Sequence, residues 1–141
     1  MAAAHKNKTL ATLMASLLGA TGAHRFYLYG RRDLWAWVHL TSLPLSAVGL
    51  TIGYRVAPAF AFLFATPLML AALAGALEAL VLGLTPDAKW DATHNPDSGR
   101  ATDSNWPLAL ILVLTLATGM GGLIFLISRT FDLMFTGGAY G

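Results

Sequence analysis

Glu78 is the residue whose type and position could do chemistry in this chain. It lies in an apolar segment, six residues before Leu84. Ionisable residues inside membrane segments are rare, and they hold a counter-charge or relay a proton or an ion. We predict that Glu78 pairs with Arg25, with His24 or His39 as secondary partners. The alternative is that Glu78 only reaches interfacial water.

A second set of polar residues could suggest a metal. Asp91, His94 and Asp97 recur every three residues, but Pro96 interrupts the helix that would align them. A metal site needs ligands that their surroundings hold rigidly. The sequence contains no His-Glu-x-x-His, Gly-x-Ser-x-Gly or phosphate-loop pattern. We therefore predict no catalytic residue, no metal and no cofactor, and we expect that the protein is not an enzyme.

The composition places the chain in a membrane. Hydrophobic residues make up 56% of its 141 residues and charged residues only 11%, whereas soluble domains carry about 25% charged residues. The net charge is +2 and the basic residues are scattered, so the basic stripe of a nucleic-acid-binding protein is missing. There is no cysteine for a disulfide or a thiolate site.

Four apolar segments can position these residues. A span needs about 20 helical residues, and the first segment is marginal because it must be counted through Leu28. A cleaved signal peptide is the alternative for that segment. We predict a single all-α transmembrane domain with four spans, or three spans plus a shallow or re-entrant N-terminal helix. The expected parts are a tail (1–9), a helical hairpin (10–57), a third helix (58–84), a polar loop with a short amphipathic turn (85–106), a fourth helix (107–135) and a tail (136–141).

The positive charges leave the orientation open. With four spans, five Lys and Arg residues lie on one side of the membrane and four on the other. With a re-entrant first segment, Lys6 and Lys8 join the larger group and the division becomes seven to two. Lys and Arg favour the cytoplasmic side, so only the second arrangement has a clear bias.

Small residues recur at four-residue spacing in two segments. Such spacing lets helix backbones approach closely. We predict that these positions pack helices together, either within the chain or between chains. They are Ala15 and Gly19 in the first segment, and Ala71, Gly75, Ala79 and Gly83 in the third.

Residues 6–30 resemble the start of the TM2-domain family. The match consists of a basic lead-in, a small-rich helix ending Leu18-Gly-Ala-Thr-Gly-Ala, and then the string His24-Arg-Phe-Tyr-Leu. It covers about a fifth of the chain. The resemblance implies two hydrophobic helices around a short turn, with Arg25, Phe26 and Tyr27 in that turn. His24 departs from the family, which often has Asp there.

These observations lead to a functional expectation. We expect a small non-enzymatic integral membrane protein of the TM2-domain type, in a bacterial cytoplasmic (inner) membrane. Its partners are the lipid bilayer and either itself or another membrane protein. The interaction motif consists of the turn, including His24, together with Glu78 as the buried counter-charge. The alternative is an oligomeric small channel or transporter with Glu78 and His39 in a polar path.

Overall fold

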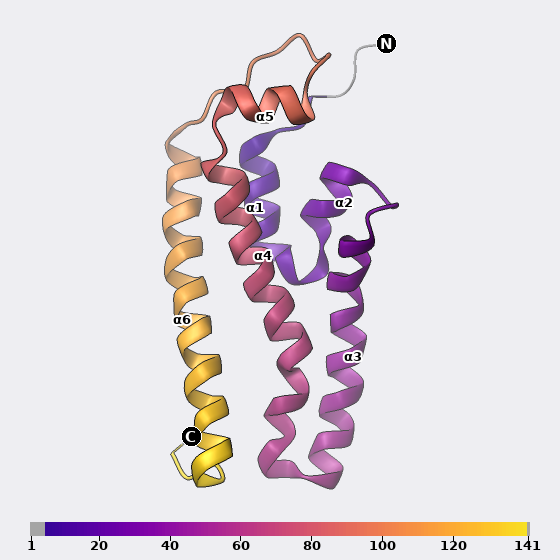
Figure 1. Ribbon diagram of the computed structural model, residues 1–141, viewed down its shortest axis with the longest axis vertical. Helices are drawn as coiled ribbons and strands as arrows, with labels where there is room; N and C mark the ends of the chain where they lie inside the picture. The colour runs from indigo at the N-terminus through magenta and orange to yellow at the C-terminus, as the bar shows by residue number, and fades with distance from the viewer. Residues whose placement is uncertain (1–4, 141) are drawn as a thin grey trace.

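The computed structural model describes residues 5–140, and these form helices and connecting turns without a strand. Three long helices run side by side, and shorter helices gather at one end of the bundle (Figure 1). The elements in chain order are α1 (Lys8–Leu18), η1 (Gly19–Thr21), α2 (Ala23–Tyr29), α3 (Leu34–Val56), η2 (Pro58–Ala65), α4 (Thr66–Leu84), α5 (Asp87–His94) and α6 (Trp106–Thr136).

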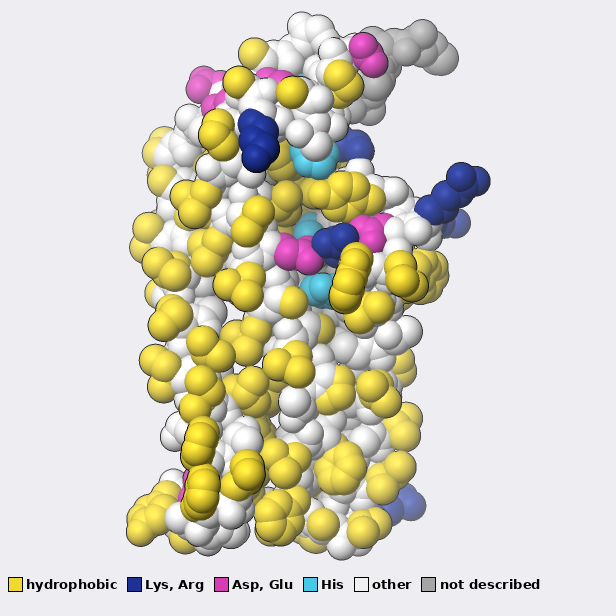
Figure 2. Space-filling view, viewed as in Figure 1, with side chains coloured by type: hydrophobic (Ala, Val, Ile, Leu, Met, Phe, Trp, Pro, Cys, Tyr) yellow, Lys and Arg dark blue, Asp and Glu magenta, His cyan; other side chains and the backbone are white. Residues whose placement is uncertain are grey.

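Three segments are long and apolar enough to cross a membrane. They are α3, the continuous η2–α4 segment, and α6. Large hydrophobic side chains on all three are exposed, among them Val48, Leu77 and Ile124. Figure 2 shows hydrophobic side chains over the whole length of the bundle. A soluble domain does not expose so much continuous apolar surface, so the all-helical membrane architecture agrees with the composition.

The first apolar segment does not reach across. Helix α1 has 11 residues, which span about 16 Å, roughly half of a hydrocarbon layer of about 30 Å. The chain then reverses through η1, and α2 runs back beside α1 (Figure 1). Gly22 makes the reversal possible, because its φ of 70° is a conformation that other residues rarely adopt. The four-span bundle is therefore not confirmed, since α1 is too short to be a fourth span.

The two ends of this N-terminal hairpin (α1, η1 and α2) meet at the same level. The Asn7 backbone N–H donates to the Tyr27 hydroxyl at 2.9 Å, and the Lys6 ammonium donates to the Leu28 carbonyl. The hairpin thus enters and leaves the bundle at one end. This geometry is compatible with the re-entrant alternative that the sequence leaves open.

The expected polar loop at 85–106 contains a complete helix. Helix α5 lies across the end of the bundle (Figure 1), and it buries Trp90, which is 1% exposed. The Trp90 indole N–H donates to the Lys6 carbonyl at 3.1 Å, and Lys8 forms an ion pair with Asp87 at 2.8 Å. Helix α5 therefore lies within the segment where the sequence predicts a short amphipathic turn. Helix α1 begins at Lys8, inside the expected tail.

Small residues hold the hairpin against α4. Ala15 and Ala79 are fully buried, and a Cβ built on Gly19 would lie 2.6 Å from the Gly75 Cα. Only glycine backbones can approach so closely. Gly83 lies in the same row, where a Cβ would meet side chains of both α1 and α6. Ala71, the remaining predicted packing residue of α4, is only partly buried and lines a groove between α4 and α3 instead.

Candidate functional site

Five ionisable side chains meet where the hairpin touches α3 and α4. Helix α2 contributes His24 and Arg25, and α4 contributes Glu78. Asp33 is the N-cap of α3, where its carboxylate accepts from the Trp35 backbone N–H at 2.8 Å. His39 lies further along α3. We call these five residues the charged cluster: His24, Arg25, Asp33, His39 and Glu78.

Arg25 binds two carboxylates. Its Nη1 donates to Glu78 Oε1 at 2.8 Å, and its Nε donates to Asp33 Oδ2 at 3.0 Å. The guanidinium also lies over the Tyr29 ring, 5.3 Å from the centroid. The contact between Arg25 and Glu78 that the sequence predicted is therefore present, and it ties the hairpin to α4.

His24 is buried and bonded through one nitrogen. It is 1% exposed, its Nε2 contacts Glu78 Oε2, and its Nδ1 has no hydrogen-bond partner. A carboxylate can only accept, so the hydrogen-bond geometry assigns the proton to Nε2. A second proton on Nδ1 would be a buried donor without an acceptor, which is costly. His24 is therefore joined to the cluster through Nε2 alone.

His39 has the opposite arrangement. Its Nδ1 donates to the Gly19 carbonyl at 2.7 Å, which assigns the first proton to Nδ1. Its Nε2 lies 3.9 Å from Glu78 Oε1. In neutral His39 this nitrogen is an acceptor facing a carboxylate, which provides no proton. Nε2 is therefore the His39 nitrogen that faces the carboxylate of Glu78.

The charged cluster contains more carboxylates than guanidinium groups. Arg25 faces both Asp33 and Glu78, so these three side chains together carry a formal charge of −1.

Two cavities meet at the cluster. A groove of about 670 Å³ is lined by residues of α3 and α4, and a smaller cavity of about 230 Å³ is lined by residues of α2 and α4. Arg25 and Glu78 line both. Glu78 is 30% exposed and Arg25 19%. Figure 2 shows basic, acidic and histidine side chains together on this face, surrounded by hydrophobic ones.

The remaining residues of the turn pack against neighbouring helices. Phe26 packs edge-on against Trp37, with ring centroids 5.3 Å apart. Tyr27 packs against the buried Leu28 and Trp90 and accepts a hydrogen bond through its hydroxyl. The structure thus brings together His24, Arg25 and Glu78, while Phe26 and Tyr27 support the turn. Whether the motif binds a partner stays a prediction.

Sequence reasoning missed Asp33. The signal that could have revealed it is an acidic residue directly before a long apolar run, which is typical of a helix N-cap. An N-cap carboxylate already faces backbone N–H groups. Its second role, as a ligand of Arg25, depends on how α2 folds back toward the start of α3.

The polar residues of the 85–106 segment hold that segment together. Asp91 accepts from the Thr102 backbone N–H at 2.7 Å and from the Asn95 side chain at 3.0 Å. Hydrogen bonds from Thr102, and then from Asn95, lower the pKa of Asp91 to about 2. His94 packs on Trp90, with ring centroids 4.3 Å apart, and burial lowers the pKa of His94. Within residues 5–140, no group of three His, Asp or Glu side chains is arranged to hold a metal.

Scans against protein-family models, curated proteins and solved structures found no match to this chain. The resemblance to the TM2-domain family therefore rests on residues 6–30 alone. It stays a prediction.

Proposed function

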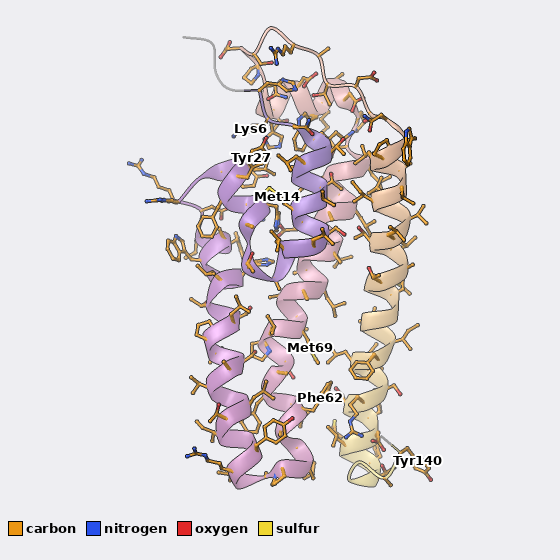
Figure 3. All side chains as sticks on the ribbon, turned by 180° about the vertical axis from the view of Figure 1, so that it is seen from behind. Lys6, Met14, Tyr27, Phe62, Met69 and Tyr140 are labelled. Carbon is orange, nitrogen blue, oxygen red and sulfur yellow. The ribbon has the colours of Figure 1, made fainter. Side chains whose placement is uncertain are left out.

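We propose that this chain is a small, non-enzymatic integral membrane protein with three spanning helices and a re-entrant N-terminal hairpin. The ion pair between Lys8 and Asp87 supports this topology, because it joins the start of α1 to the helix that follows α4. Lys6 therefore lies at the α5 end of the bundle, while Tyr140 lies at the opposite end (Figure 3).

The distribution of positive charge supports an orientation for this topology. Seven Lys and Arg residues belong to the α5 end, whereas Arg55 and Arg129 belong to the other. Since Lys and Arg near helix ends favour the cytoplasmic side, we place the α5 end in the cytoplasm. A bacterial cytoplasmic membrane is part of this proposal.

Single cysteines test the topology directly, because the natural chain has none. Cysteines at His5, Asp97 and Tyr140 are labelled with a membrane-impermeant maleimide in intact cells and in inverted vesicles. We expect His5→Cys and Asp97→Cys to react from the same, cytoplasmic side and Tyr140→Cys from the other. Labelling of positions 5 and 97 from opposite sides would instead establish the four-span arrangement.

We further propose that the protein acts through association with itself or another membrane protein, as a member of the TM2-domain type. The observation that carries this proposal is the unpartnered face of α6. Only Leu108, Thr115 and Leu133 are buried in that 31-residue helix. Ala117 and Gly121 are four residues apart and exposed, and a Cβ on Gly121 would meet no atom within 4 Å. Small residues at this spacing allow close packing of another helix.

Association is tested by energy transfer between two labelled populations in liposomes and by co-purification from native membranes. We expect a stable assembly that Gly121→Leu weakens. Ala109→Leu is the matched control, since it enlarges another exposed small residue of α6. A monomer without a co-purifying partner, in both the natural chain and Gly121→Leu, would reject the proposal.

A second candidate function is an oligomeric channel or transporter that uses Glu78 and His39. The observation in its favour is that two cavities meet at Glu78. The far end of α3 packs closely against η2, because Phe64 of η2 fills the space beside Gly49 and Gly53. A continuous path therefore requires movement or a second copy. Proton or cation flux into liposomes that Glu78→Gln abolishes would support this function, and absence of flux with the natural chain would reject it.

A further inference from the structure

We propose that the groove between α3 and α4 binds an amphipathic organic cation, with the cationic group at Glu78 and the apolar part along the two helices. This inference rests on the second candidate function, because it names the class of ligand that the Glu78 site would take. It does not require that the ligand be carried across the membrane.

The groove has the size and lining of a small-molecule site. Its volume of about 670 Å³ lies within the range of ligand pockets, about 300–1,000 Å³. Val38, Leu45 and Leu70 supply apolar walls, and the small side chains of Ala71 and Ala74 leave the space open. Apolar walls with a polar group at one end match a molecule that has an apolar body and one charged head.

The charge of the site selects a cation over an anion. Arg25 lines the groove, but two carboxylates already neutralise its guanidinium. Arg25, Asp33 and Glu78 together carry a formal charge of −1, and the partly exposed Glu78 lines the groove. Charge interactions are stronger next to low-dielectric surroundings than in water. An anionic head would meet the same carboxylate and be repelled.

An aromatic ring at the groove adds to this preference. Trp35 lines the groove and is 62% exposed. The face of an indole attracts cations, and tryptophan is the strongest of the aromatic side chains in this respect. Two attractive features for a cation, a carboxylate and an indole, therefore line one space.

Tetraphenylphosphonium and tetraphenylborate test the inference, because they have similar size and shape but opposite charge. Binding to the purified full chain is measured by equilibrium dialysis against empty detergent micelles. We expect saturable binding of the cation to one site per chain and no saturable binding of the borate. Equal saturable binding of both ions, or of neither, would overturn the inference.

Variants separate the charge from the shape of the site. Glu78→Gln is expected to weaken cation binding about tenfold or more. Ala74→Leu fills the groove without changing a charged residue and is expected to block binding, whereas Ala72→Leu, at an exposed position of the same helix, leaves it unchanged. Unchanged binding in both Glu78→Gln and Ala74→Leu would reject the site.

Flux measurements distinguish this inference from the function on which it rests. Saturable, Glu78-dependent binding without flux in liposomes would keep the binding site and reject transport. Glu78-dependent flux without preference for the phosphonium over the borate would keep transport and reject the ligand class.

Discussion

Replacing Gly19 with alanine is expected to destabilise the bundle, because the added methyl group has no room against α4. The new Cβ would lie 2.6 Å from the Gly75 Cα and 3.0 Å from its carbonyl carbon. Both are backbone atoms and cannot rotate away. To reach an ordinary contact of 3.4 Å, the two elements must separate by about 0.8 Å, and they lose part of their dispersion contacts on both sides.

The expected cost is about 1–3 kcal/mol, the usual range for overpacking a close contact. The backbone of position 19 is ordinary right-handed helix, with φ −56° and ψ −39°, so alanine adds no conformational strain there. The Gly19 carbonyl also accepts the hydrogen bond from His39. Movement of this backbone should therefore disturb the charged cluster as well.

Unfolding in increasing dodecyl sulfate, followed by helical circular dichroism, measures this cost. Gly121→Ala is the matched control, since its Cβ would meet nothing within 4 Å, and we expect little change in its midpoint. Gly75→Ala disrupts the same contact by adding a methyl group on the α4 side. The double variant should therefore lose less stability than the sum of the losses in the two single variants. A Gly19→Ala midpoint equal to that of Gly121→Ala would refute the close approach of the hairpin to α4.

Three further outcomes are expected. Arg25→Glu and Glu78→Arg should each cost about 2 kcal/mol, as for a lost charged hydrogen bond. The double variant should recover part of the lost stability in the same assay. A double variant whose loss of stability equals the sum of the two single losses would argue against the ion pair. Trp90→Ala should cost about 3 kcal/mol or more through the cavity it leaves, seen as faster proteolysis of the segment after α4. The lowered pKa of Asp91 means that its stabilisation is complete above its ordinary value of 3.8 and is lost as the pH falls toward about 2. Asp91→Asn should therefore flatten the acid side of the melting-temperature profile, and a profile identical to that of the natural chain would count against this role.

The membrane class and the long helices could be predicted because they depend on local properties. Hydropathy and length suffice to find α3, η2–α4 and α6. The contact between Arg25 and Glu78 could also be predicted, since a carboxylate in an apolar segment needs a partner and Arg25 is close in the expected order of segments. His24 and His39 were expected as secondary partners, and both lie beside Glu78.

The path of the first segment could not be decided in this way. Its apolar length is near the limit for a span, so hydropathy allows both a fourth span and a re-entrant hairpin. The ion pair of Lys8 with Asp87 and the close approach of Gly19 to Gly75 join residues far apart in the chain. No local pattern shows that these residues meet.

Hydropathy and residue type were enough to predict helices that are long and apolar enough to span a membrane, with one carboxylate inside an apolar segment. Tertiary packing decided which groups share that carboxylate. Asp33 binds Arg25, and the Gly19 carbonyl holds one nitrogen of His39 so that the other faces Glu78. These roles depend on distances between four separate elements. Such distances depend on how closely small residues let the elements approach one another. The spacing of residues along a single helix does not show which other element it approaches.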